Sequence, residues 1–123
     1  MDVRVLIVDD EADIRLVLKL AVQAHDRGLV VAGEAADGWE ALEALDRADP
    51  SVIVLDHRMP TISGLETAAK ILERRPQQII ILFSGYLDDK LRSDAAALGV
   101  KACIPKQNID RVAPLALELG SAA

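Results

Sequence analysis

Residues 52–60 of the chain have the sequence Val52-Ile53-Val54-Leu55-Asp56-His57-Arg58-Met59-Pro60. Its four β-favouring apolar residues predict a strand over residues 52–55 that is buried on both faces, as strands of a parallel sheet are. The strand runs directly into the carboxylate of Asp56, and Pro60 ends the segment. Because carboxylates are rarely buried without a partner, Asp56 is predicted to be a functional group.

Similar apolar runs alternate with amphipathic segments along the whole chain. Strands are predicted over residues 4–8, 29–35, 52–55, 79–83 and 102–104. Helices are predicted over residues 12–24, 39–45, 64–74, 88–98 and 109–119, and Pro114 predicts a kink or a late start in the last one. Strict alternation implies right-handed crossovers and a parallel sheet covered on both faces. The predicted fold class is therefore three-layer, doubly wound α/β.

Composition limits the function classes. The 123 residues predict one domain spanning 1–123, in which residues 120–123 resemble the stub of a linker. The net charge of −6 argues against direct binding of nucleic acid, which needs clustered Lys and Arg. The single Cys103 excludes an internal disulfide. Without a signal peptide pattern or an apolar run of bilayer length, the chain is expected to be soluble and cytoplasmic, with no membrane insertion.

Polar residues follow the predicted strands at the edge where α/β sheets bind ligands. Asp9, Asp10 and Glu11 follow the first strand, and Asp56, Ser84 and Lys106 follow or end the third, fourth and fifth. Each has a simpler interpretation on its own. Asp9 and Asp10 could cap the first helix, Ser84 could be a turn residue and Lys106 a solvated lysine.

Together these residues predict phosphoryl chemistry at a metal site. Three carboxylates repel one another unless a cation holds them, and Mg²⁺ is the natural candidate because it prefers oxygen ligands and bridges carboxylates to phosphate oxygens. Zinc is disfavoured, since its soft ligands here are only His25, His57 and Cys103. With its charge masked, Asp56 can act as the nucleophile toward phosphorus, while Lys106 and Ser84 stabilise the phosphoryl oxygens.

The order and spacing of these residues resemble the receiver (CheY-like) domain of bacterial two-component response regulators, over essentially the whole chain. The matching pieces are Val8-Asp9-Asp10-Glu11, Asp56 with Met59-Pro60 and Gly64, Ser84-Gly85, and Pro105-Lys106. The resemblance implies the flavodoxin-like strand order 2-1-3-4-5. It also implies that Asp10, Asp56 and the backbone carbonyl of Arg58 ligate Mg²⁺ directly, and that Asp9 acts through water.

By the same resemblance, Asp56 would accept a phosphoryl group from phosphohistidine on a sensor histidine kinase or a histidine phosphotransfer protein. The surface of the fourth helix, fifth strand and fifth helix would then change and bind an output domain or a downstream protein; a homodimer is a further candidate. The chain would catalyse its own phosphotransfer and dephosphorylation, in which Asp56, Ser84 and Lys106 take part, and no other reaction.

The chain departs from the family pattern at Cys103, where receivers usually carry an aromatic residue on the fifth strand. The alternative is therefore a receiver-like interaction module that works without phosphorylation. A flavodoxin-like cofactor binder or nucleotide enzyme is disfavoured, because Asp9, Asp10 and Glu11 stand where such proteins need phosphate-binding amides. We also expect Arg58 and Tyr86 to stack as a partial lid over the phosphoryl site.

Overall fold

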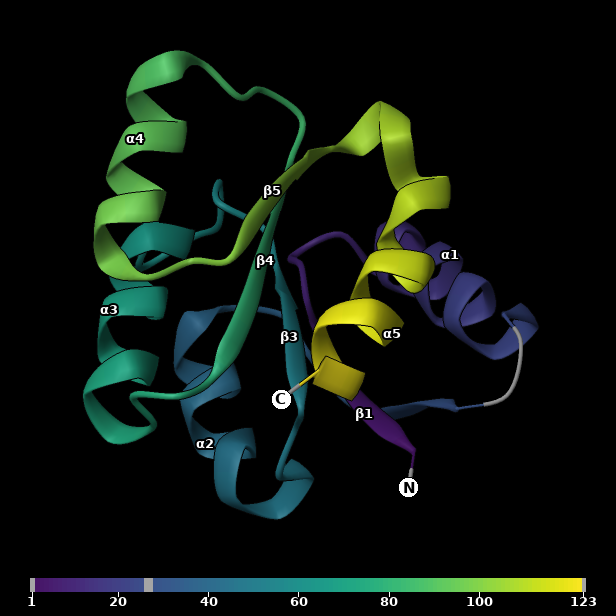
Figure 1. Ribbon diagram of the computed structural model, residues 1–123. Helices are drawn as coiled ribbons and strands as arrows, with labels where there is room; N and C mark the ends of the chain where they lie inside the picture. The colour runs from purple at the N-terminus through teal and green to yellow at the C-terminus, as the bar shows by residue number, and fades with distance from the viewer. Residues whose placement is uncertain (1, 26–27, 123) are drawn as a thin grey trace.

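The four residues of β3 (Val52–Leu55) are all buried at the centre of a five-stranded parallel sheet. The computed structural model describes residues 2–25 and 28–122 (Figure 1). The other strands are β1 (Val3–Val8), β2 (Leu29–Ala35), β4 (Ile79–Ser84) and β5 (Ala102–Pro105). Their spatial order is β2-β1-β3-β4-β5. Both the predicted fold class and the predicted strand order are confirmed.

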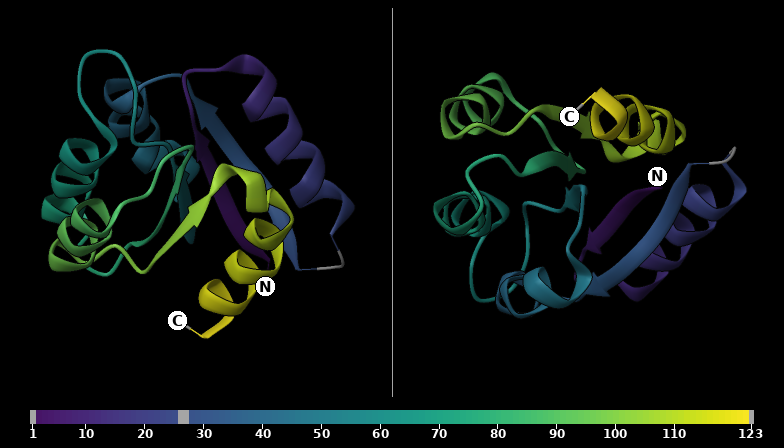
Figure 2. Two further views of the ribbon diagram at one scale, coloured as in Figure 1. Left: turned by 90° about the horizontal axis from the view of Figure 1, so that it is seen from above. Right: turned by 60° about the horizontal axis from the view of Figure 1, so that its bottom comes forward.

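Two layers of helices cover the sheet. On one face lie α1 (Ala12–Ala24) and α5 (Val112–Ala122); on the other lie α2 (Gly38–Ala48), α3 (Gly64–Arg74) and α4 (Asp89–Leu98) (Figures 1 and 2). Each layer encloses its own apolar core, and alternate residues of β1 and β3 point into one core or the other. This explains why the central strands are continuously apolar in sequence.

Local capping sets most helix starts. Asp37 accepts a hydrogen bond from the Glu40 amide at the start of α2, and Ser63 forms a reciprocal capping box with Glu66 at α3. Asp88 caps α4, so that helix begins one residue later than predicted. The late start of α5 is confirmed: a 3₁₀ helix over Lys106–Arg111 precedes it.

The first turn of α5 contains Pro114, and its last turn contains most of the expected linker stub. Pro114 lies in the first turn of α5, where a missing amide removes little hydrogen bonding. Residues 120–122 of the expected linker stub form the last turn of the helix, and Ala123 lies outside the described residues. Gly120 packs so closely on Val3 that a Cβ on Gly120 would lie 2.5 Å from Cγ1 of Val3.

Across the described ranges, no helix combines the length and the apolar character needed to span a bilayer.

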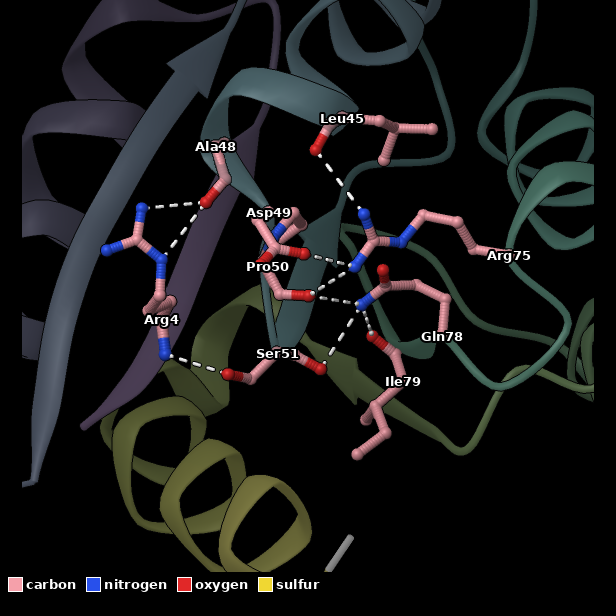
Figure 3. Close-up of polar contacts among 9 residues, drawn as sticks. All are labelled: Arg4, Leu45, Ala48, Asp49, Pro50, Ser51, Arg75, Gln78 and Ile79. Atoms are coloured by element: carbon pink, nitrogen blue, oxygen red, sulfur yellow. Dashed lines mark hydrogen bonds and ion pairs between the residues drawn. The ribbon is translucent and has the colours of Figure 1, made fainter. Parts of the chain in front are cut away.

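A polar network ties the loops at the amino ends of β3 and β4 to β1 (Figure 3). The buried Gln78 donates from Nε2 to the carbonyls of Pro50, Ser51 and Ile79, at 3.2, 3.2 and 3.4 Å. Arg4 donates from Nη2 to the Ala48 carbonyl at 2.7 Å. These bonds satisfy backbone acceptors near the β3 entry and fix that loop.

Candidate functional site

The parallel register brings four strand ends together. Val8 pairs with Leu55, Leu55 with Leu82, and Ser84 with Pro105. The residues at or just beyond these ends therefore converge at one edge of the sheet: Asp9, Asp56, Ser84 and Lys106. Asp9 is 0% exposed, Asp56 3% and Ser84 2%. The structure thus brings these four residues to one edge of the sheet, and their roles in a site stay a prediction.

Lys106 connects the two buried carboxylates. Its Nζ lies 3.1 Å from Oδ2 of Asp9 and 3.4 Å from Oδ2 of Asp56. Its side chain is 21% exposed, so the ammonium reaches inward from the start of the 3₁₀ helix. Lys106 is therefore not the solvated lysine of the simpler interpretation. One ammonium faces two carboxylates, and the buried part of the site retains a net negative charge.

The pKa values of Asp56 and Lys106 are shifted by burial and by the neighbouring charges. Burial, followed by the charge of Asp9, raises the pKa of Asp56 to about 6, and Lys106 opposes the rise. Burial alone would lower the pKa of Lys106, but its hydrogen bond to Asp9 and the charge of Asp56 outweigh burial and raise it. At neutral pH the site thus holds a positive lysine and an Asp56 carboxylate that is destabilised where it stands.

The acidic run after β1 has the composition of a hard-cation site. Asp9, Asp10 and Glu11 each offer an oxygen ligand, and these atoms lie within 4.8 Å of one another. Asp9 is buried, whereas Asp10 and Glu11 are exposed. An oxygen-only donor set with solvent access on one side fits Mg²⁺, which keeps several waters. Neither Asp9 nor Asp10 is the N-cap residue of α1, which is Glu11; Asp9 Oδ1 accepts instead from the amide of Glu11 itself, at 2.9 Å.

Glu11 is the residue that the expected ligand set omits. It stands in the acidic run of the sequence, so the signal is present, but the expected ligands are only Asp9, Asp10, Asp56 and the Arg58 carbonyl. Glu11 also lines a pocket of about 330 Å³ together with Asp56, Ser84 and Lys106. The pocket is open to solvent above Asp56, and a phosphoryl group is small enough to enter it.

Ser84 is held by its own loop. Its Oγ donates to the Tyr86 carbonyl at 3.1 Å and accepts from the Tyr86 amide at 3.4 Å. The hydroxyl lies at the end of β4 and lines the same pocket as Asp56. These bonds agree with the turn interpretation of Ser84, and its role toward a phosphoryl group stays a prediction.

The loop after Asp56 is shaped by a close approach at Gly64. The Gly64 amide donates to the His57 carbonyl at 2.7 Å. A Cβ on Gly64 would lie 2.3 Å from the Asp56 carbonyl oxygen. His57 is half-buried, and burial, followed by the Arg58 charge, lowers its pKa. Arg58 is exposed and lines the pocket above Asp56.

The sequence singles out three further residues, Arg58, Tyr86 and Cys103. The predicted Arg58–Tyr86 stack is not found within the described residues, where the cation–π contacts are Lys70 over Trp39 and Lys106 over Phe83. Tyr86 is instead 60% exposed, and both side chains line the pocket wall. Cys103 is half-buried and packs against the core under α2, α3 and α4, as a small apolar residue would.

Comparisons with known proteins agree with this geometry. The family model described as the response regulator receiver domain matches residues 5–114. A protein-glutamate methylesterase/protein-glutamine glutaminase of Geobacter metallireducens is 46% identical over 86 residues, which cover 70% of this chain and 24% of that protein. The transcriptional regulatory protein YdfI of Bacillus subtilis is 38% identical over 103 residues, covering 84% of this chain and 47% of that protein.

Solved structures give the same picture. The response regulator domain of Thermotoga maritima CheB is similar over 100% of this chain and 96% of that chain, with a TM-score of 0.85 and 30% identity. A CheX-CheY complex with BeF₃ and Mg from Borrelia burgdorferi contains a chain that is 26% identical, with a TM-score of 0.84 over 98% of this chain and 89% of that one. The chain spans less than half the length of each of the two curated relatives, so the activities of those whole proteins are not assigned to it.

Proposed function

This chain belongs to the response regulator receiver domain family, whose members accept a phosphoryl group in two-component signalling, and on that premise we propose that Asp56 is the acceptor. The observation that carries the assignment is the position of Asp56: buried at the end of β3, 3.4 Å from Lys106, and facing a pocket that can admit a phosphoryl group. No other carboxylate combines these properties among the described residues, since Asp9 has no place in the wall of that pocket.

In the proposed reaction an Asp56 carboxylate oxygen forms a bond to phosphorus while the bond from phosphorus to a histidine nitrogen of the donor breaks. The electron pair of that bond returns to the imidazole. Lys106 already sits within ion-pair distance of Asp56, so it can turn one of its three donors to an incoming phosphoryl oxygen. Ser84 can donate to a second oxygen after it releases the Tyr86 carbonyl.

Mg²⁺ would be held by Asp10, Asp56 and the Arg58 carbonyl, with Asp9 contributing through water and Glu11 beside them. When bound it supplies positive charge to carboxylates and phosphoryl oxygens that would otherwise repel. Two features of this chain support a Mg²⁺ site. The possible ligands are all oxygen atoms, and Lys106 by itself balances only one of the two buried carboxylate charges.

The test is intact mass spectrometry after incubation with acetyl phosphate. Wild type should gain the mass of one phosphoryl group in the presence of Mg²⁺ and none when a chelator removes the metal. Asp56→Asn keeps the size of the side chain but removes the nucleophile, so its mass should not change. Asp46→Asn is the matched control, because Asp46 is exposed on α2, and it should label as wild type does.

The same measurement also tests the second candidate function, an interaction module that works without phosphorylation. That candidate is favoured by Cys103, which offers no aromatic ring to move when Ser84 turns. A wild-type chain that stays unmodified in Mg²⁺ and acetyl phosphate, while folded by circular dichroism, would favour the module.

The family indicates the kinds of partner. Receiver domains interact with histidine kinases, phosphotransfer proteins and output domains, and we propose that this chain does so through two surfaces. The donor approaches the Asp56 pocket, and the output partner binds the face of α4, β5 and α5. Ser84 links the two surfaces, because its hydroxyl bonds the Tyr86 backbone and Tyr86 lines a second pocket with Leu91 and Asp94 of α4.

A further inference from the structure

Arg15 joins the acidic site to the edge strand of the sheet. It lies on α1 with its side chain 17% exposed. Its Nη1 donates to the backbone carbonyl of Asp9 at 2.7 Å, and its Nε donates to Oε1 of Glu34 on β2 at 2.9 Å. Lys19, one turn further along α1, holds the other oxygen of the same carboxylate, Glu34 Oε2, at 2.5 Å. The hydrogen bond from Lys19, followed by that from Arg15, lowers the pKa of Glu34.

The bond to Asp9 completes the fixation of that residue. The Asp9 amide donates to the Ala35 carbonyl at 3.1 Å, its Oδ1 accepts from the Glu11 amide at 2.9 Å, and its Oδ2 forms the ion pair with Lys106. The carbonyl oxygen is the remaining polar atom, and Arg15 binds it. Every polar atom of Asp9 is therefore held by a different neighbour.

The Asp9 carbonyl matters because it belongs to the peptide that joins Asp9 to Asp10. A peptide unit is planar and rigid, so fixing its oxygen also fixes the direction of the N–Cα bond of Asp10. Asp10 is exposed and has no side-chain bond of its own within the described ranges. Arg15 thus sets the plane from which the Asp10 carboxylate projects.

We propose that Arg15 is a positioning residue for the divalent-cation site: its guanidinium, anchored by Glu34, holds the peptide between Asp9 and Asp10 in the orientation that places both carboxylates for one ion. The inference rests on the proposed Mg²⁺ site and adds a part of its construction. Arginine suits this role because its planar fork can bond a carbonyl and a carboxylate at once, which a lysine cannot do with the same geometry.

Charge and geometry make opposite predictions here. Arg15 is a positive charge close to a site for a cation, so removing it should strengthen Mg²⁺ binding if only electrostatics matter. If the bond to the Asp9 carbonyl positions the ligands, removing it should weaken Mg²⁺ binding by about 10-fold or more, as loss of groups that orient metal ligands does.

The test measures Mg²⁺ affinity by isothermal titration calorimetry on the full chain. Arg15→Gln should raise the Kd by about 10-fold. Lys19→Gln is the matched control: it removes the same charge from the same helix and the same Glu34 partner but never touches Asp9, so its Kd should stay within about two-fold of wild type, or fall slightly. The double variant Arg15→Gln with Glu34→Gln conserves net charge and should remain as weak as Arg15→Gln.

A kinetic readout separates positioning from general damage. The Mg²⁺ concentration that gives half the maximal labelling rate by acetyl phosphate should rise about 10-fold in Arg15→Gln, while the rate at saturating Mg²⁺ stays within about three-fold of wild type. If Arg15→Gln fails to fold, Arg15→Lys serves instead; it keeps the charge and loses the fork, and its Kd should rise as well.

Two outcomes count against the proposal, and they can be told apart. If folded Arg15→Gln binds Mg²⁺ as tightly as wild type or more tightly, Arg15 positions nothing and the inference is overturned while the proposed function stands. If wild type itself shows no Mg²⁺ binding, the proposed metal site is wrong and the role of Arg15 falls with it.

Discussion

At the scale of single residues, the site depends on one cation that serves two anions. Lys106 lies 3.1 Å from Asp9 and 3.4 Å from Asp56, both of which are almost fully buried. Burial of a carboxylate is unfavourable unless a partner compensates its charge. Lys106 therefore stabilises the resting site, and in the proposed function it also binds a phosphoryl oxygen.

Lys106→Ala should separate metal binding from phosphoryl transfer. Mg²⁺ should bind at least as tightly as in wild type, because the cation no longer competes with an ammonium for Asp9 and Asp56. The labelling rate by acetyl phosphate should fall by about 100-fold, the size of effect seen when one preorganised donor to a developing charge is lost. Calorimetry and timed mass spectra measure the two quantities.

Lys101→Ala is the control for Lys106→Ala, since Lys101 is an exposed lysine just before β5. It should change neither quantity. A Lys106→Ala protein that lost Mg²⁺ affinity as strongly as labelling rate would show that the lysine only maintains the structure of the pocket.

At the scale of elements, the two loops that flank the pocket differ in how much freedom they have. In the β3–α3 loop, Gly64 packs against the backbone of Asp56 and His57. In the β4–α4 loop, a Cβ on Gly85 would meet nothing within 4 Å. The first loop is therefore packed tightly behind Asp56, whereas the second has open space at Gly85.

Gly64→Ala should destabilise the fold and Gly85→Ala should not. The new Cβ at position 64 would lie 2.3 Å from the Asp56 carbonyl oxygen and 2.6 Å from the His57 Cα, and backbone atoms cannot move aside as a side chain can. We expect a loss of about 3 kcal/mol in the free energy of unfolding for Gly64→Ala and less than about 0.5 kcal/mol for Gly85→Ala. Urea denaturation followed by circular dichroism measures both. Equal stability of the two variants would contradict the close approach.

Phosphorylation should loosen or reorder the β4–α4 loop. A Ser84 hydroxyl that donates to a phosphoryl oxygen must leave the Tyr86 carbonyl, to which it now donates at 3.1 Å. Hydrogen exchange of the segment 85–91 should therefore change when Mg²⁺ and beryllofluoride, a phosphoryl mimic, are added. Ser84→Ala should remove most of that change, while exchange in α2 stays constant in both proteins. An unchanged loop in wild type that binds the mimic would exclude Ser84 as the link to α4.

At the scale of the whole molecule, the buried charge of Asp56 lowers the stability of the folded state. The sheet and both apolar cores support a site that holds two buried carboxylates and one lysine. Burial raises the pKa of Asp56 to about 6 from an ordinary value of 3.8, which means that the charged form is disfavoured in the folded state. The fold therefore carries an unfavourable charge at neutral pH.

Asp56→Asn should stabilise the metal-free protein in a pH-dependent way. The folded state binds the Asp56 proton more tightly than the unfolded state, so wild-type stability falls as pH rises from about 4 to about 6. Below about pH 4 Asp56 is protonated in both the folded and the unfolded state, so its charge has no effect on stability. Above about pH 6 the full destabilisation by the buried carboxylate charge remains. The free energy of unfolding of Asp56→Asn should thus exceed that of wild type by up to about 3 kcal/mol at pH 8 and by far less near pH 4.

Denaturation of both proteins in chelator, across pH 4 to 8, measures this difference and cancels the other groups that titrate in the same range. A difference that does not grow with pH would show that Asp56 is not held in a destabilised charged form.

The amino-acid sequence was enough to predict the fold class, the strand order through the family resemblance, and the placement of the proposed site residues at strand ends. Apolar runs set the strands, and the rule that parallel strands end at one edge brings Asp9, Asp56, Ser84 and Lys106 together without any coordinates. Helix ends are predicted less well where a cap decides them, as at Asp88.

The contacts between individual atoms became visible only in the folded chain. That Lys106 bridges Asp9 and Asp56, that Ser84 is held by the Tyr86 backbone, and that Arg15 reaches the Asp9 carbonyl all depend on side-chain directions across separate elements. The expected Arg58–Tyr86 stack is not found among the described residues for the same reason: spacing along the chain places two residues near a site, but loop geometry decides whether their side chains face each other. Periodicity is a local property of the sequence, whereas contacts between loops are set by the packing of the whole sheet.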